Sequence, residues 1–358
     1  LYEFNFAMFI IYIEQLTYYF KYDPYIEEVI NNYRKKDEDC LIESYKILIE
    51  NLWPSNSKYQ QENNNNKTYY EPNDFKKKIS SMNPLFSGIQ ANDAKDLVNF
   101  IILTLHEELN KKKDNNISRA YEDQKNETKM LNDFVEYFSK GNDSIISDLF
   151  YGVNHTITKC SGCNIPLHNY ECYFFLIFPL EEVRKFKLNE LQKINNNIMM
   201  NQYDINKKIQ LLNNNIVDIK DCFDYNKKIE YFSGDNAMYC SNCKKQLDAT
   251  YQTFLYSLPQ ILVIILNRGI GIQFKVKVEF SEIIDLSAFA KIGGTFELIS
   301  VITYLGEADS SGHFIATCKS PIDNKWYCYI DDKVSEVNDF KSEILEKPVP
   351  YILFYKRQ

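Results

Sequence analysis

The sequence predicts an α+β domain, with helices in its first part and a mostly antiparallel sheet region in its second. Three observations support this prediction. Apolar residues recur at three- and four-residue steps before about residue 140, runs rich in Ile, Val and Phe follow Tyr151, and two Cys-x-x-Cys pairs interrupt those runs. With 358 residues, of which 45% are apolar and 25% charged, the chain can bury a core without disulfide bonds.

Residues 1 to about 140 are expected to be helical. The clearest helix follows Asp93, whose carboxylate can cap amide groups at the positive helix end, and Lys111 to Lys113 follow the other end. The tract Asn63 to Asn66 has nothing to bury, so we expect a loop there. One face of the expected helix collects the apolar residues Ala94, Leu97, Val98, Ile101, Ile102, Leu105 and Leu109.

The second part of the chain is expected to form strands. Tyr173 to Leu180 and Leu258 to Leu266 are nearly unbroken apolar runs, which is typical of buried strands. Between them, the Asn-rich segment Val183 to Lys220 reads as an insertion of weak helix or loop. Separated by turn residues, the further candidate strands are Phe296 to Thr303, His313 to Cys318, Trp326 to Ile330 and Tyr351 to Tyr355.

Charge and hydropathy narrow the class of partner. The formal net charge of −8 argues against a nucleic-acid binder, which normally carries a basic face. No run reaches the roughly eighteen apolar residues that a membrane span needs, so we expect no membrane partner either. The chain opens on Leu1 instead of methionine, and we therefore expect a fragment. Cysteines at metal-binding spacing indicate a reducing compartment, the cytoplasm or the nucleus.

The strongest chemical signal is a set of four cysteines, Cys160, Cys163, Cys240 and Cys243. Two thiolates separated by two residues can turn toward one ion, and two such knuckles complete a tetrahedral set. A closed four-cysteine site is structural, so we predict one structural Zn²⁺ ion. The alternatives are reduced cysteines in turns or a redox pair. The remaining cysteines have no ligand spacing and are expected to pack as small apolar groups: Cys40, Cys172, Cys222, Cys318 and Cys328.

A second candidate site surrounds His313. The polar stretch Gly306 to Ser311 precedes Gly312 and His313, and an apolar strand follows. A hairpin between that strand and Trp326 to Ile330 would bring Asp331 or Asp332 close to the imidazole. A carboxylate in that position fixes the imidazole tautomer for nucleophilic catalysis. The alternative is a solvated turn.

These residues resemble a known family. The segment from Phe296 to Tyr355 looks like the C-terminal box of the ubiquitin-specific proteases, which are papain-like cysteine proteases. The match extends over about residues 80 to 180 and 220 to 358, in family order. Its motifs are Phe296-Glu-Leu-Ile-Ser-Val301, Gly312-His313-Phe314, Trp326 to Tyr329, Tyr351 to Tyr355, Leu149 to Gly152, Leu258 to Leu262, Leu266 to Arg268, and Asp93, Ala94 and Asp96 within Gln90 to Leu97.

The resemblance implies a papain-like cysteine protease fold with a helical thumb, an antiparallel palm sheet and zinc-ribbon fingers. It places the thumb at 1–145, the fingers at 146–182 and 218–257, an insertion at 183–217 and the palm at 258–358. Ubiquitin or a ubiquitinated protein is then the expected partner, with its tail between thumb and palm. By residue, His313 falls on the catalytic base, Asp331 on the aspartate beside the third triad member, Asp93 and Gly312 on the substrate side, and the four cysteines on the zinc ligands.

The sequence departs from the family at three positions. No nucleophile box is present around Cys40, the first cysteine, and counting back from Ile13 to Phe20 places the nucleophile near Leu1 or just outside the chain. Ile330 stands where the family has the third triad member, and isoleucine cannot accept a hydrogen bond. Ala91 replaces a family glutamine.

Three hypotheses therefore remain open. The first is a thiol-dependent deubiquitinase whose nucleophile lies upstream of Leu1. The second is a catalytically inactive family member that binds ubiquitin or acts as a scaffold. The third is an unrelated zinc-ribbon interaction protein, which would have no use for the residues around His313 and Trp326.

Overall fold

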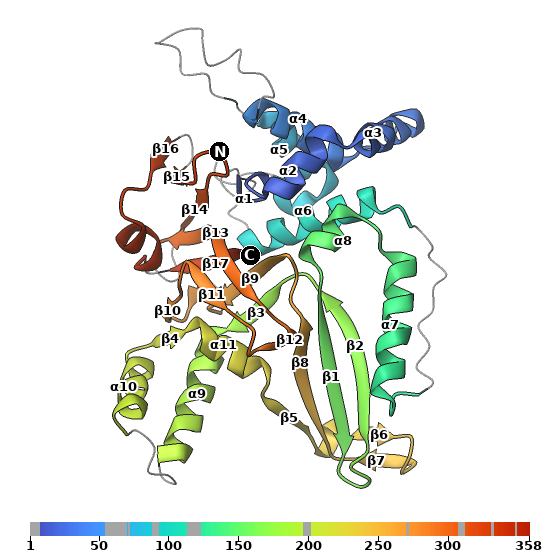
Figure 1. The fold of residues 1–358 in the computed structure, drawn as a ribbon, viewed down its shortest axis with the longest axis vertical. Coiled ribbons are helices and arrows are strands. Elements are labelled where there is room, and N and C mark those ends of the chain that lie inside the picture. The colour runs from blue at the N-terminus through green and yellow to red at the C-terminus, as the bar shows by residue number, and fades with distance from the viewer. Residues whose placement is uncertain are drawn as a thin grey trace.

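The computed structural model describes residues 8–53, 70, 72–87, 93–112, 123–195, 202–269, 272–306, 312–330, 333–347 and 349–358, and Figure 1 shows their arrangement. The helices are α1 (Met8–Ile11), α2 (Glu14–Tyr22), α3 (Pro24–Lys36), α4 (Leu41–Leu52), α5 (Asn73–Met82), α6 (Ala94–Leu109), α7 (Glu127–Gly141), α8 (Ile145–Phe150), α9 (Leu180–Asn195), α10 (Gln202–Asn213) and α11 (Ile219–Asn226). The strands are β1 (Gly152–Cys160), β2 (Pro166–Tyr173), β3 (Leu176–Pro179), β4 (Ile216–Asp218), β5 (Ile229–Phe232), β6 (Met238–Cys240), β7 (Lys245–Leu247), β8 (Ala249–Ser257), β9 (Ile261–Asn267), β10 (Lys277–Glu279), β11 (Ile283–Asp285), β12 (Ala290–Ile292), β13 (Thr295–Leu305), β14 (His313–Lys319), β15 (Trp326–Ile330), β16 (Lys333–Glu336) and β17 (Pro350–Arg357).

The helical part of the chain packs around α6. Asp93 caps this helix by accepting a hydrogen bond from the amide of Lys95 at 3.0 Å. The apolar face predicted from Ala94 to Leu109 is buried, which confirms the helix that the sequence indicated. Helix α4 contacts α2, α5 and α6, and together these helices cover one face of the large sheet.

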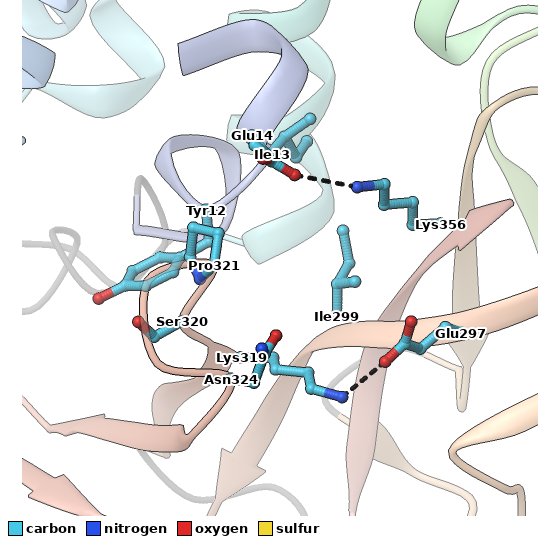
Figure 2. A pocket seen from close by; sticks show the side chains of 10 residues that line it. All are labelled: Tyr12, Ile13, Glu14, Glu297, Ile299, Lys319, Ser320, Pro321, Asn324 and Lys356. Atoms are coloured by element: carbon cyan, nitrogen blue, oxygen red, sulfur yellow. Dashed lines mark hydrogen bonds and ion pairs between the residues drawn. The ribbon is translucent and has the colours of Figure 1, made fainter. Parts of the chain in front are cut away.

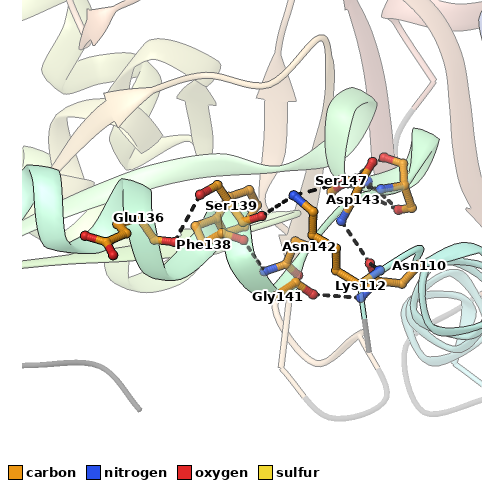
Figure 3. A network of polar contacts seen from close by, with 10 residues as sticks. Asn110, Lys112, Glu136, Phe138, Ser139, Gly141, Asn142, Asp143 and Ser147 are labelled. Atoms are coloured by element: carbon orange, nitrogen blue, oxygen red, sulfur yellow. Dashed lines mark hydrogen bonds and ion pairs between the residues drawn. The ribbon is translucent and has the colours of Figure 1, made fainter. Parts of the chain in front are cut away.

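A polar network joins the end of α6 to α7 and α8 (Figure 3). The side-chain amide of Asn110 donates to the carbonyl oxygen of Gly141 at 2.7 Å, and its oxygen accepts from the amide of Asp143 at 2.9 Å. The ammonium group of Lys112 donates to the carbonyl oxygen of Ser139 at 2.6 Å. These bonds satisfy backbone groups left over at the end of α7, where no further helical turn can do so.

The large sheet has the strand order β16-β15-β14-β13-β17-β9-β3, with β11 beside β13. It is antiparallel except for the pair of β3 with β9. On β17, Ile352 and Phe354 face the helical part, whereas Leu353 and Tyr355 face a second core that includes residues of α9, α10 and α11. Both faces are covered, which explains why β9 and β17 are unbroken apolar runs in the sequence.

A second sheet extends from the body of the molecule (Figure 1). Its order is β12-β8-β1-β2, with β5 beside β8, and α7 packs against β2. The small β6–β7 hairpin lies at the far end of the long strands. Among the described residues, a single apolar cluster connects α7 to this sheet. It joins Met130 and Phe134 of α7 to Tyr170 of β2.

The structure corrects three secondary-structure predictions. The run from Tyr173 to Leu180 is two strands, because β2 ends and β3 begins on either side of Phe174 and Phe175, which pack against the helical core. Strand β9 begins only at Ile261, after Pro259, which has no amide for the ladder. The Asn-rich insertion contains two regular helices, α9 and α10, packed against each other. The Asn63 to Asn66 tract lies outside the described residues.

No helix among the described residues combines the length and the hydropathy that crossing a membrane requires.

Candidate functional site

The two Cys-x-x-Cys knuckles have the same backbone conformation. Each is followed by a residue with positive φ, Asn164 at 54° and Lys244 at 55°. The amide of Asn164 donates to the carbonyl oxygen of Cys160 at 2.8 Å, and the amide of Lys244 to that of Cys240 at 2.7 Å. The αL residue turns the chain back after the second cysteine, which directs both thiols of a knuckle to one side.

The four thiols form one cluster, as the sequence predicted. All four Sγ atoms lie within 4.8 Å of one another, with 4.0 Å between Cys160 and Cys243 and 3.8 Å between Cys163 and Cys240. A tetrahedral ion with bonds of about 2.3 Å to sulfur places its ligands roughly 3.8 Å apart, so the spacing fits zinc. A tetrahedral ion held by all four sulfurs would have no open position for water or substrate.

Backbone groups support the thiolates. The amides of Gly162 and Cys243 approach the sulfurs of Cys160 and Cys240 at 3.3 and 3.4 Å. The bond from the Cys243 amide is the main cause that lowers the pKa of Cys240 to about 7. A β-carbon at Gly162 would lie 2.7 Å from a terminal methyl carbon of Leu247 and 3.3 Å from the sulfur of Cys243, so glycine lets both side chains pack closely against this knuckle.

His313 begins β14 and lies opposite Leu305 of β13. A β-carbon on the preceding Gly312 would overlap the ring of Tyr304, so only glycine permits this packing. Phe314 contacts the same Tyr304 ring edge-on, with 5.1 Å between ring centroids. The imidazole is half-buried at the edge of the sheet.

The predicted partners of His313 are only partly described. Asp331 lies outside the described residues. Ile330 ends β15 and pairs with Lys333 of β16. Its neighbour Tyr329 lies opposite Ala316, and its hydroxyl group forms a hydrogen bond with that of Tyr12.

Asp93 lies where the helical part meets the large sheet. The hydroxyl group of Tyr351 donates to both of its carboxylate oxygens at 2.8 Å, and the ammonium group of Lys95 forms an ion pair with it. Burial and the nearby Asp93 carboxylate raise the pKa of Tyr351. Since Phe314 packs on Tyr351 at 5.2 Å, a continuous set of contacts joins Asp93 to the residue after His313.

Cys40, the first cysteine in the chain, is remote from this junction. It precedes α4, and the amides of the next residues, Leu41 and Ile42, donate to the carboxylate of Glu108 at 2.8 and 2.9 Å. Glu108 lies near the end of α6 opposite to Asp93. At about 1.5 Å per residue, the two ends of this 16-residue helix are roughly 22 Å apart.

The other cysteines outside the knuckles do not approach His313 either. Cys318 lies five positions further along β14, about 16 Å away at the usual strand rise. Burial also raises its pKa to about 12, which keeps the thiol protonated. Cys328 pairs with Thr317, and Cys222 is fully buried in α11. Cys172 is in β2 of the second sheet.

All nine cysteines of the sequence lie within the described residues. Four form the candidate metal centre and five are placed elsewhere, so the structure brings no thiol beside His313 in the part of the chain that it describes. Helix α1, which packs against β14, has the sequence Met-Phe-Ile-Ile and supplies none.

A cavity of about 110 Å³ lies beside the opposite end of β14 (Figure 2). Lys356 forms an ion pair with Glu14 at its rim, and Lys319 with Glu297. It is separated from His313 by the length of the strand, so we do not assign it to the same site. Its other lining residues are Tyr12, Ile13, Ile299, Ser320, Pro321 and Asn324.

Sequence reasoning missed two residues of the junction. Tyr351 is predicted from the sequence as the start of a strand and as part of a family motif, and Arg268 as part of a motif, but neither of them is assigned to the site. Both are buried polar residues at the ends of apolar runs, and that position is the signal that could have identified them.

Comparisons with known proteins agree with the resemblance in the sequence. The model of the family described as ubiquitin carboxyl-terminal hydrolase matches residues 9–355. The chain is 23% identical over 334 residues to ubiquitin carboxyl-terminal hydrolase Usp2 of Drosophila melanogaster, covering 90% of this chain and 30% of that protein. It is 24% identical over 332 residues to ubiquitin carboxyl-terminal hydrolase 2 of Gallus gallus, covering 88% of this chain and 80% of that protein.

Solved structures share the fold. The yeast SAGA DUBm with an Sgf73 mutant matches with a TM-score of 0.59 and 16% identity, over 99% of this chain and 65% of that chain. The SAGA Ubp8/Sgf11/Sus1/Sgf73 DUB module bound to ubiquitin aldehyde matches with a TM-score of 0.60 and 16% identity, over 99% of this chain and 66% of that chain. The helical thumb, the palm sheet and the zinc-ribbon fingers of the predicted fold are thus all present.

Proposed function

Because the chain belongs to the ubiquitin carboxyl-terminal hydrolase family, we propose that it is a ubiquitin-binding domain in which none of the nine cysteines acts as a nucleophile. The observation that carries this proposal is the placement of those cysteines. A cysteine protease needs its thiol within hydrogen-bond reach of the base, about 3 Å. Cys318, the cysteine on the same strand as His313, is about 16 Å from it at the strand rise.

The partner we propose is ubiquitin or a ubiquitinated protein. A related fold in the SAGA DUB module was solved bound to ubiquitin aldehyde, which supports the transfer of this partner. The tail of ubiquitin would lie between α6 and the large sheet, where Asp93 and Gly312 meet it. The bounds of thumb, fingers, insertion and palm given above are part of the same proposal, as is a location in the cytoplasm or the nucleus.

We propose zinc as the metal of the four-cysteine centre. The sulfur spacing and the all-thiolate donor set support zinc over harder cations. When bound, it supplies no reaction chemistry and links the β1–β2 hairpin to the β6–β7 hairpin. The cysteines therefore stabilise the fold of the fingers, and the surface that binds the partner depends on them only through that fold.

The remaining triad positions also favour binding over catalysis. Ile330 offers no acceptor for the imidazole N–H, so the tautomer that a general base needs is not fixed from this position. Asp331 is the residue we propose for that role if the domain is active. A second candidate function, thiol-dependent hydrolysis after the last ubiquitin glycine, is supported by the Gly312–His313 pair and requires a thiol from outside this sequence.

Titration calorimetry with ubiquitin tests the proposal. We expect one ubiquitin per chain, and no release of fluorophore from ubiquitin that carries one at its C-terminus. Absence of ubiquitin binding would contradict the proposed partner. Release of the fluorophore by this chain would contradict the proposed inactivity and favour the second candidate.

A further inference from the structure

The bond between Tyr351 and Asp93 joins two distant parts of the chain. Their positions differ by 258, and Tyr351 lies at the start of the last strand, β17. Its side chain is only 5% exposed, whereas 31% of the Asp93 side chain is accessible to solvent. The hydroxyl group thus reaches from the core to a carboxylate that a ligand can also contact.

The position of Tyr351 is itself held on three sides. Arg268, 1% exposed, donates from Nη1 to the carbonyl oxygen of Pro350 and from Nε to that of Val276 at 3.2 Å. The amide of Tyr304 donates to the carbonyl oxygen of Val349 at 2.9 Å. Phe314 packs on the tyrosine ring. The bonds to Val349 and Pro350 fix the backbone before Tyr351, and burial against Phe314 restricts its ring, so the hydroxyl orients the carboxylate instead of following it.

The carboxylate of Asp93 has a limited number of acceptor positions. A carboxylate has about four lone-pair positions. The hydroxyl of Tyr351 contacts both carboxylate oxygens, the amide of Lys95 donates to Oδ1 and the ammonium group of Lys95 pairs with Oδ2, so each oxygen has two contacts. The N–H group of an extended peptide can replace the ammonium group of Lys95, whose side chain is 37% exposed, on a carboxylate that the tyrosine orients.

We propose that Tyr351 is a positioning residue for the ubiquitin tail, which acts by orienting the Asp93 carboxylate toward a tail amide. This inference rests on the proposed function, because it assigns the ligand of Asp93 to the tail of the proposed partner. It predicts that the hydroxyl matters for the tail and not for the rest of the ubiquitin surface.

The test compares Tyr351→Phe with Tyr355→Phe. Both tyrosines lie on β17, and Tyr355 donates to the carbonyl oxygen of Ser281 at 2.8 Å, away from α6. Each variant loses one buried hydroxyl bond and keeps its ring. Binding is measured with ubiquitin and with ubiquitin that lacks its C-terminal tail. We expect Tyr351→Phe to weaken binding of ubiquitin about five- to tenfold, the equivalent of one hydrogen bond, and to leave binding of tailless ubiquitin unchanged.

A double-mutant cycle tests whether the effect of Tyr351 on ubiquitin binding depends on Asp93. Asp93→Asn retains a capping side chain, and combining it with Tyr351→Phe should weaken binding no more than the stronger single change. Equal losses with tailed and tailless ubiquitin, or losses that multiply in the double variant, would overturn the inference. So would an equal loss in Tyr355→Phe.

Amide hydrogen exchange separates failure of this inference from failure of the proposed function. Tyr351→Phe should accelerate exchange in the first turn of α6, at Lys95 and Asp96, without ubiquitin present. If the wild-type chain does not bind ubiquitin, the proposed function fails and the assignment of the tail fails with it. If the wild type binds and exchange at α6 is unchanged in Tyr351→Phe, only the positioning role fails.

Discussion

The Sγ atoms of Cys163 and Cys240 lie 3.8 Å apart, although 77 positions separate them in the chain. Cys163 follows β1 and Cys240 ends β6, so this contact joins the tip of the second sheet to the β6–β7 hairpin. Few apolar side chains are available there, because β5, β6 and β7 are largely exposed. A metal centre can supply the stability that a hydrophobic core supplies elsewhere.

The first prediction concerns this metal. Elemental analysis should find one zinc per chain, and Cys240→Ser should remove it. We expect the unfolding temperature to fall by about 2 °C for each kcal/mol of stabilisation that the ion provided. Cys172→Ser is the matched control, since Cys172 is exposed on β2, which pairs with the strand that ends at Cys160, but belongs to no metal cluster of the described residues. Full zinc retention in Cys240→Ser would contradict the site.

The second prediction concerns Glu108, a buried carboxylate that caps α4. It accepts the amides of Leu41 and Ile42, while the N-cap residue, Cys40, makes no side-chain cap bond. Glu108→Ala leaves two buried donors without this acceptor and should reduce the free energy of unfolding by roughly 2 to 4 kcal/mol. Denaturant unfolding measures the change. Glu107→Ala, at the exposed neighbouring position, should have little effect, and equal losses in both variants would exclude the capping role.

The third prediction is a loss of stability in acid. Burial lowers the pKa of His155 below its ordinary value of 6.5, an effect that Glu127 opposes and that His168 and Lys291 reinforce. The folded state then binds fewer protons than the unfolded state, so stability is complete above about pH 6.5 and falls as the pH decreases toward the folded pKa. Thermal unfolding between pH 7 and 5 should show this decrease.

His155→Phe provides the comparison, because a ring at this position can keep the stacking on Tyr170, whose centroid is 4.4 Å away. We expect a shallower dependence of the unfolding temperature on pH in this variant. Zinc content is measured at each pH, since acid also releases metal from thiolates. An unchanged slope at equal zinc content would show that His155 does not contribute.

Local sequence patterns were sufficient for much of the fold. Strand β15 has the predicted bounds, Trp326 to Ile330, because a short apolar run and flanking turn residues agree there. The two knuckles were predictable because each needs only four consecutive residues and one turn. Helix α6 was predictable because a cap and an apolar face coincide.

Contacts between distant segments were not predictable in this way. The bond from Tyr351 to Asp93 depends on how a terminal strand meets an early helix, and no local pattern encodes that distance. The same holds for Glu108, which resembles any other surface glutamate in the sequence but is 5% exposed in the fold. The helices of the insertion were underestimated because their asparagines lower intrinsic helix propensity, whereas packing of α9 against α10 and α11 stabilises them.

Ubiquitin with a vinyl electrophile at its C-terminus tests most directly whether the chain binds ubiquitin without a nucleophilic cysteine of its own. Binding and covalent capture are measured on the same sample of the 358-residue chain, with Cys172→Ser to remove the exposed thiol. We predict that the probe binds reversibly and that mass spectrometry finds no adduct on any of the eight remaining cysteines. An adduct on one of them that is lost in His313→Ala would contradict the proposal of a ubiquitin-binding domain without its own nucleophile.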